Sequence, residues 1–290
     1  MKRTKVTVIG SINMDLVTDT KRLPNKGETV MGEFFSMIPG GKGANQAVAA
    51  ARLGADVSLI GRIGEDPFGL SLRKHLEQEG ITLCEGEPVH YKSTGVASIT
   101  LAEGDNRIIV VPGANEEVTA PFVSQFEKII ASSDVVLLQL EIPLKAVECA
   151  LSLAKKHQVR TILNPAPIRS LPNSLLKDVT YFTPNEHEVG ALNIVDKAKL
   201  IVTRGEKGVT FFENDTIRSV ESYPVEVVDT TGAGDAFNGA FAVALSEGKS
   251  LKEACQFSVA VGALAVTKLG AQAGMPTREE LSYFLTRRDK

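Results

Sequence analysis

The chain has few of the residues that mark secreted, metal-binding or nucleic-acid-binding proteins. Among 290 residues it has three cysteines, no tryptophan and 6% aromatic residues. Cys84, Cys149 and Cys255 stand alone, without the CxxC or Cys/His spacing of a zinc site. We therefore expect reduced, structural thiols in a cytoplasmic protein rather than disulfides.

Charge of one sign and long apolar runs are also lacking. The net charge is −3 and there is no Lys/Arg block, so neither a nucleic acid nor a membrane is expected as a partner. Apolar runs such as residues 135–138 are far too short to span a bilayer. Residues 1–5 lead directly into a strand-like run, so we expect no signal peptide.

What the chain does have is an alternation of short β-branched runs with helical patterns. The strand-like runs are residues 6–9, 57–60, 135–140, 161–163 and 200–203. The helical stretches are residues 44–53, 68–79, 121–130, 144–157, 233–245 and 251–266. This alternation predicts a single α/β domain over 1–290, with a mostly parallel sheet covered by helices on both faces.

Two segments interrupt that rhythm. Residues 15–38 carry turn signals between runs of mixed polarity, and residues 94–111 read as a hairpin with its turn at 104–106. We expect both to form a small β-flap, or lid, over the carboxyl edge of the sheet, where open α/β sheets bind ligands.

The most informative stretch is residues 229–239, Asp-Thr-Thr-Gly-Ala-Gly-Asp-Ala-Phe-Asn-Gly. Gly232, Ala233 and Gly234 leave backbone N–H groups uncovered where a helix begins, which predicts an anion site. Asp235 lies in the first turn beside it. A carboxylate next to a bound phosphate is repulsive unless it has chemistry to perform, such as accepting a proton from an attacking hydroxyl. The alternative is that Asp235 only complements the helix dipole.

Two further polar clusters follow strand-like segments. Residues 39–46, Pro-Gly-Gly-Lys-Gly-Ala-Asn-Gln, lack the spacing of a Walker P-loop, and suit either a polyol or a sterically tight helix start. Asn13 and Asp15 follow the first strand one residue apart, so an extended chain points both to the same side, toward adjacent sugar hydroxyls. They are also common turn formers.

Together these segments resemble the ribokinase branch of the carbohydrate-kinase (PfkB) family, which also contains fructokinases and adenosine kinases. The resemblance covers nearly the whole chain. It rests on the motifs at 10–15 and 40–46, Leu-Glu at 140–141, Asn-Pro-Ala-Pro at 164–167, Thr-Pro-Asn-Glu at 183–186, residues 229–235, and Gly-Ala-Gln at 270–272. It implies a ribokinase-like fold and ATP-dependent phosphorylation of D-ribose at O5.

The resemblance also implies roles for individual residues. Asp235 is the expected base, with the anion hole at Gly232, Ala233 and Gly234. The expected ribose ligands are Asn13, Asp15, Gly41, Lys42, Asn45, Glu141 and Asp235. The expected ATP-site residues are Asn185, Thr203, Gly205, Gly208 and Gly234, with Glu188 acting through water on Mg²⁺. The expected K⁺ ligands are Asp229, Thr231, Ala265, Lys268, Gly270 and Gly274. A homodimer through the β-flap is expected.

One departure concerns the nucleotide side. Only residues 187–199 separate the Thr-Pro-Asn-Glu motif from the next strand, which leaves little room for the full helix that similar proteins have there.

Three other functions remain open or are disfavoured. A sister kinase acting on fructose, deoxyribose or adenosine is the nearest alternative, although the flap offers adenosine little apolar wall beyond Phe34, Phe35 and Ile109. A sugar-binding regulator without catalysis is a second. A Rossmann oxidoreductase is disfavoured because no GxGxxG follows the first strand.

Overall fold

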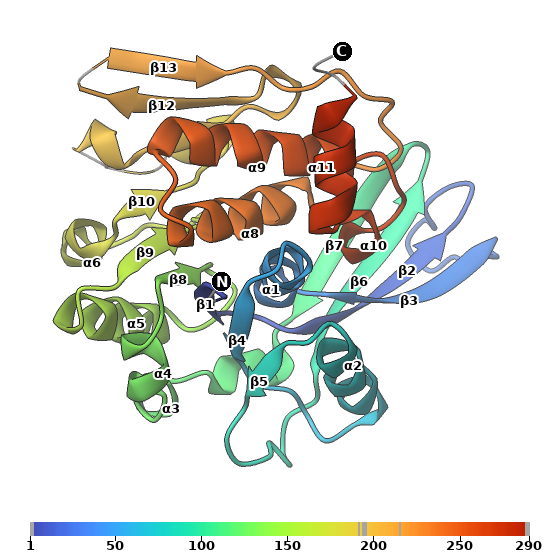
Figure 1. Ribbon diagram of the computed structural model, residues 1–290. Helices are drawn as coiled ribbons and strands as arrows, with labels where there is room; N and C mark the ends of the chain where they lie inside the picture. Colours follow the sequence, from blue (N-terminus) through green and yellow to red (C-terminus); the bar gives the residue numbers. More distant parts are fainter. Residues whose placement is uncertain (1–2, 191, 193–195, 215, 288–290) are drawn as a thin grey trace.

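The computed structural model describes residues 3–287 apart from 191, 193–195 and 215. Its centre is a six-stranded parallel sheet in the order β10-β9-β8-β1-β4-β5 (Figure 1). The strands are β1 (Lys5–Ile9), β4 (Asp56–Ile60), β5 (Thr82–Cys84), β8 (Val135–Leu138), β9 (Arg160–Leu163) and β10 (Tyr181–Phe182). The predicted parallel sheet is confirmed, and four predicted strands lie in it with ends within two residues of those expected.

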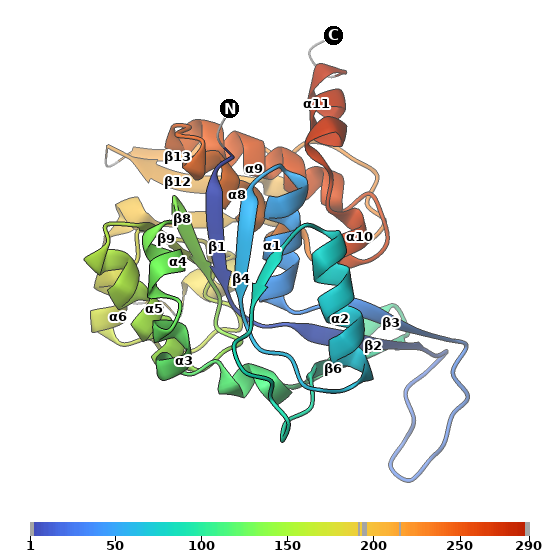
Figure 2. The ribbon, with the colours of Figure 1, turned by 60° about the horizontal axis from the view of Figure 1, so that its bottom comes forward.

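Helices cover both faces of this sheet (Figure 2). On one face lie α1 (Lys42–Arg52), α2 (Pro67–Gln78), α8 (Ala233–Ser246) and α9 (Leu251–Ala265). On the other lie α3 (Ala120–Ser124), α4 (Glu127–Ala131), α5 (Leu144–Lys156) and α6 (Asn173–Asp178). Strand side chains alternate between the two cores, as Val8 and Ile9 of β1 show. Both faces are buried, which explains the nearly continuous apolar strands in the sequence.

Two predicted elements differ from the structure. Residues 200–203 contain β11 (Ile201–Thr203), which pairs antiparallel with β12 (Val209–Glu213), and β12 pairs in turn with β13 (Thr216–Val220). Towards the central sheet this segment makes isolated parallel bridges, Phe182 to Leu200 and Asn185 to Thr203, at the end of β10. A tight turn with Gly208 at φ +81° folds β12 back onto the edge of β11 opposite those bridges. The helix expected at 121–130 is split into α3 and α4, where Phe126 leaves helical geometry and packs edge-on against Phe122.

The remaining short helices lie at loops and at the carboxyl end of the chain. They are α7 (Glu186–Val189), α10 (Ala271–Gly274), α11 (Arg278–Thr286) and the 3₁₀ turns Gly113–Glu117, Lys197–Lys199 and Gly205–Lys207. Between Glu186 and β11 the structure describes only α7 and one 3₁₀ turn. Residues 191 and 193–195 lie outside the described part. None of the helices in the described ranges has both the length and the hydrophobicity for crossing a membrane.

The segments that interrupt the α/β rhythm form a second sheet, in the order β3-β2-β6-β7, which extends away from the body (Figures 1 and 2). Its strands are β2 (Asn13–Asp19), β3 (Phe34–Gly40), β6 (Gly95–Ala102) and β7 (Asp105–Val111). The β6–β7 turn is at Glu103 and Gly104, one residue earlier than predicted. Both have positive φ, as a two-residue hairpin turn that matches strand twist requires.

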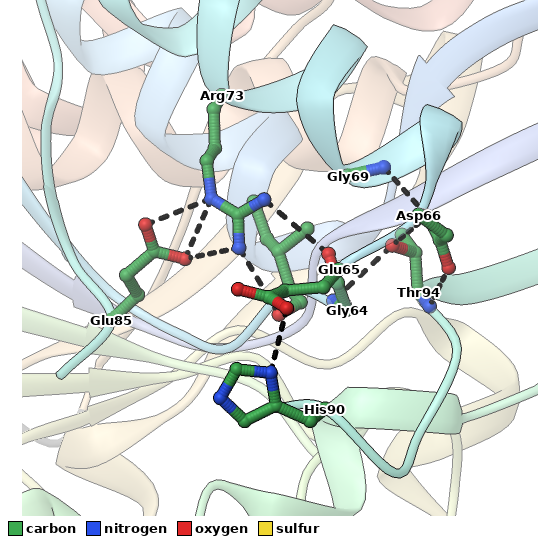
Figure 3. A network of polar contacts seen from close by, with 9 residues as sticks. Gly64, Glu65, Asp66, Gly69, Arg73, Glu85, His90 and Thr94 are labelled. Atoms are coloured by element: carbon green, nitrogen blue, oxygen red, sulfur yellow. Dashed lines mark hydrogen bonds and ion pairs between the residues drawn. The ribbon is translucent and has the colours of Figure 1, made fainter. Parts of the chain in front are cut away.

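A polar network ties the base of this flap to the body (Figure 3). Asp66 caps α2 by accepting from the Gly69 N–H, and it also accepts from the N–H and hydroxyl of Thr94 at 2.6 and 2.7 Å. Thr94 is the residue before β6 and is fully buried. The guanidinium of Arg73 in α2 donates hydrogen bonds to the Glu85 carboxylate and to the carbonyl of Gly64. The start of β6 is therefore fixed to the first turn of α2, so the flap is anchored where it leaves the sheet.

Candidate active site

The predicted sugar-binding residues meet where β1 passes into the flap. Asn13 and Asp15 lie in β2 on the same face of the strand, paired in register with Gly40 and Ile38 of β3. Asn13 is 3% exposed, and its side-chain oxygen accepts from the Nδ2 of Asn115 at 2.7 Å. Asn115 also bonds the backbone N–H and carbonyl of Ile12. The sequence analysis did not identify Asn115, which orients Asn13.

The glycines of residues 40–43 are needed for close backbone approach. A Cβ on Gly40 would lie 2.3 Å from a carboxylate oxygen of Asp15, and one on Gly43 would lie 2.6 Å from the Gly10 carbonyl carbon. Gly41 has φ +86°, which disfavours any other residue. The glycines of this motif are therefore sterically required, and this need is compatible with ligand binding at the same helix start. Glu141 accepts from the backbone N–H of Lys42 at 3.1 Å and from the Ser11 hydroxyl at 2.6 Å.

Asp235 lies in the first turn of α8, and its two carboxylate oxygens face α1. Oδ2 accepts from Nδ2 of Asn45 and Oδ1 from Nε2 of Gln46, each at 2.9 Å. The two helices approach closely because Gly239 faces α1, where a Cβ would lie 2.6 Å from that of Ala49. Asp235 is 7% exposed. A carboxylate with so little solvent exposure requires charged or hydrogen-bonding partners, and Asn45 and Gln46 of α1 supply them.

Three carboxylates and one ammonium group share this site. Burial raises the pKa of Asp235, while the Lys42 ammonium and the two amide donors oppose that rise. Burial also raises the pKa of Asp15 to about 7, and the negative charges of Glu141 and Asp235 add to the rise. The negative charge of Asp235 in turn raises the pKa of Lys42. The arrangement suits a neutral ligand rich in hydroxyl donors, with Asp235 available as a proton acceptor.

The turn before α8 has the geometry of an anion site. Gly232 caps the helix with φ +78° and lies against Ala271. Apart from its chain neighbours and the nearby backbone of α8, no heavy atom of the described chain lies within 4 Å of the point where a Cβ would extend from Gly234, so this side of the turn is open. The Ala233 N–H donates to the Thr230 carbonyl at 3.2 Å, a long bond. The open Gly234 and the dipole of α8 therefore define the position for an anion, next to Asp235.

The predicted nucleotide residues gather at the end of β11. Asn185 and Thr203 form a parallel bridge, and the Thr203 N–H donates to the Pro184 carbonyl at 2.9 Å. Gly205 and Gly208, both with positive φ, make the turn that follows. Glu188 completes a capping box with Asn185 at the start of α7.

The loops that carry the predicted cation ligands lie side by side. The Asp229 carboxylate accepts from the N–H and hydroxyl of Thr231 and, at 2.8 Å, from the N–H of Gly270. Burial opposes ionisation of Asp229, but these hydrogen bonds outweigh it and lower its pKa. Gly274 lies over Ala265, where a Cβ would be 2.2 Å from the Ala265 carbonyl oxygen. Lys268 directs its ammonium away, to Glu280 at 2.8 Å.

The family model described as "pfkB family carbohydrate kinase" matches residues 3–278. A ribokinase of Bacillus subtilis (strain 168) is 44% identical over 97% of this chain and 99% of its own length, and one of Lactococcus lactis subsp. lactis (strain IL1403) is 45% identical over 96% of each. The solved structure of an Arabidopsis thaliana ribokinase complexed with ribose and ATP is similar with a TM-score of 0.90, at 33% identity, and the match covers 98% of this chain and 99% of that one.

Proposed function

The chain belongs to the pfkB family of carbohydrate kinases, and we propose that it transfers the γ-phosphoryl group of ATP to O5 of D-ribose, giving D-ribose 5-phosphate and ADP. The observation that supports this most is the position of Asp235, a buried carboxylate in the first turn of α8 beside the open turn at Gly234. A hydroxyl and a phosphate held there would lie next to a proton acceptor and a helix N-terminus together.

In this mechanism the sugar is held from the flap side and the body. The ribose hydroxyls are bound by Asn13 and Asp15 from β2, by the backbone of Gly41, and by the side chains of Lys42, Asn45 and Glu141. Asp235 takes the proton from O5, which attacks the γ-phosphorus in line. The N–H groups at 232–234 stabilise the charge on the transferred group. Closure of the flap excludes water, which otherwise competes as the acceptor.

The nucleotide side is assigned to Asn185, Thr203, Gly205, Gly208 and Gly234. Kinases of this kind use ATP with a divalent cation, and Mg²⁺ neutralises charge on its phosphates. Glu188 fits a role beside it through water. One carboxylate oxygen of Glu188 accepts a hydrogen bond from the Asn185 N–H, and its other oxygen accepts none within the described residues.

The function is tested by an ADP-release assay with ribose, 2-deoxyribose, fructose and adenosine. We expect the largest kcat/KM with ribose. A preference for another acceptor would assign the chain to a sister kinase. Tight sugar binding without ADP release from any of the four would indicate a sugar-binding regulator.

We further propose activation by K⁺. The carbonyl oxygens of Thr231 and Lys268 accept no hydrogen bond within the described residues, so both remain available to a hard cation beside the Asp229 carboxylate. Ala265, Gly270 and Gly274 complete the proposed set. A bound cation would order the 229–235 loop, so K⁺ should raise kcat several-fold over Na⁺ at fixed ionic strength. Asp229→Ala should remove that difference. Identical rates in K⁺, Na⁺ and a bulky organic cation would leave Asp229 as a cap of its turn.

Dimerisation through the flap is proposed from its exposed apolar side chains. Phe34, Phe35 and Met37 of β3 are 65, 57 and 57% exposed, and all of Ile108 to Val111 in β7 are exposed. Three other apolar residues of the flap, Val30, Val96 and Ile99, are half-buried. Because neighbouring strand residues point to opposite faces, both faces of this small sheet carry exposed apolar side chains. Exposed apolar surface of this extent on a small sheet marks an interaction surface.

Sedimentation velocity tests the dimer. The wild-type chain should sediment as a dimer at micromolar concentration, and Ile109→Asp in β7 should shift it to monomer. Ile217→Asp in β13, a residue 65% exposed outside the flap, is the matched control and should leave the dimer intact. A wild-type monomer at all concentrations would contradict the proposal.

A further inference from the structure

The amides that hold Asp235 are themselves held by a second layer of amides. Gln46 accepts on its Oε1 from Nε2 of Gln139 at 2.5 Å. Asn45 accepts on its Oδ1 from Nε2 of Gln272 at 2.9 Å. The exposed fractions of these four side chains are 6% or less, so water does not compete for their hydrogen bonds.

This second layer decides which end of each first-layer amide faces the carboxylate. Gln139 and Gln272 each present an N–H, so Gln46 and Asn45 turn their oxygens toward them and their NH₂ groups toward Asp235. If either amide rotated by half a turn, its oxygen would face the carboxylate and its NH₂ would face another NH₂. Both contacts are repulsive in a dry interior.

Gln272 is oriented in the same way from the other side. Its Oε1 lies 2.6 Å from Nε2 of His75 in α2. Its backbone carbonyl accepts from Arg52, at the end of α1, at 2.5 Å. Donors thus run in one direction, from His75 through Gln272 and Asn45 to Asp235. The α10 segment is thereby connected to the base through side chains alone.

The opposite branch is also constrained. A Cβ on Gly10 would lie 2.0 Å from Oε1 of Gln139, so glycine at that position leaves room for the Gln139 amide. That Oε1 is buried and has no hydrogen-bond partner within the described residues. Gln139 therefore keeps an unsatisfied acceptor while its NH₂ is used on Gln46, which indicates that the orientation is set by the needs of Gln46.

We propose that Gln46 and Gln272 are positioning residues for the phosphoryl transfer, Gln46 by donating to Asp235 directly and Gln272 by fixing the amide of Asn45, so that both oxygens of Asp235 stay hydrogen-bonded and ionised. The inference rests on the proposed role of Asp235 as the base.

The charges around Asp235 explain why this second layer matters. Asp15 of β2 and Glu141 after β8 are like charges, and Lys42 of α1 is the favourable one. Burial and the charge of Glu141 favour the protonated form of Asp235, which cannot accept a proton from a hydroxyl. Lys42 and the amide donors oppose them. Removing one donor therefore raises the pKa of Asp235 further and moves the acidic limb of turnover to higher pH.

The experiment measures kcat, KM for both substrates and the pH profile of kcat for Gln46→Leu and Gln272→Leu. We expect kcat at pH 7 to fall about tenfold, KM for ATP to stay unchanged, and part of the lost turnover to return as the pH is raised. Gln256→Leu, at an exposed position of α9, is the matched control and should keep the wild-type profile. Thermal unfolding of each variant reports the state of the fold.

Double variants separate this inference from the role of Asp235. Gln46→Leu in an Asp235→Asn background should cause no further loss, because the amide acts through the carboxylate. If Asp235→Asn is nearly inactive while the two glutamine variants keep the wild-type pH profile, the positioning role is wrong and the base stands. If the glutamine variants lose kcat equally at all pH values, the amides serve the fold and the inference is also wrong. If Asp235→Asn retains its turnover, the proposed base itself fails.

Discussion

Asp235→Asn is expected to lower kcat by about 10²–10⁴ with little change in ribose affinity. The variant has nearly the same shape but cannot take the proton of the attacking hydroxyl. Asp235 is 7% exposed, so the carboxylate is largely shielded from solvent. The measurement is steady-state turnover with ribose and ATP, together with ribose binding by calorimetry.

The structure also specifies the control. In Asp235→Asn one of the two donors, from Asn45 or Gln46, will face an NH₂ group in place of a carboxylate oxygen. Some loss of stability is therefore expected and must be measured by thermal unfolding. Retention of a third or more of wild-type turnover by a folded variant would show that Asp235 only complements the dipole of α8.

Those parts of the fold that depend on local patterns were predictable from the sequence. The β-branched runs and amphipathic stretches located the central strands and most helices because burial on both faces forces continuous apolar strands. The sheet formed by β11, β12 and β13 was not predicted. The hairpin of β11 with β12 depends on a turn at Gly205 to Gly208, which residues 200–203 do not reveal.

The same distinction applies to the site. Motif glycines and acidic residues identified the components, including Asp235, Asn45 and Lys42. Their mutual contacts could not be predicted, since Gln46 and Gln272 meet Asp235 and Asn45 across 189 and 227 residues of sequence. Gln46 lies inside a recognised motif, directly after Asn45. Its place in the sequence, however, does not indicate that its side chain contacts the Asp235 carboxylate on another helix.

Asp15→Ala is expected to weaken ribose binding by about 10- to 150-fold while leaving ATP affinity nearly unchanged. Asp15 lies on the face of β2 that it shares with Asn13, and a carboxylate there accepts from sugar hydroxyls. A lost hydrogen bond to a charged group costs about 1.5–3 kcal/mol, which corresponds to that range. Calorimetric titration of each substrate measures both affinities. Equal weakening of the two would show that Asp15 supports the fold rather than the sugar.

The pKa of Asp15 adds a pH test that separates binding from folding. Its pKa in the folded chain is about 7, against an ordinary value of 3.8, because of burial and the nearby charges of Glu141 and Asp235. The folded state thus binds the proton more tightly than the unfolded state, so this group destabilises the fold as the pH rises from about 4 through 7. Asp15→Asn should therefore raise the unfolding temperature at pH 8 and leave it unchanged near pH 4.

Ribose binding by the wild-type chain has the opposite dependence, because hydroxyl donors need the ionised carboxylate, and it should weaken as the pH falls below about 7. A wild-type ribose affinity that does not change between pH 6 and 8 would contradict the assignment of Asp15 to the sugar.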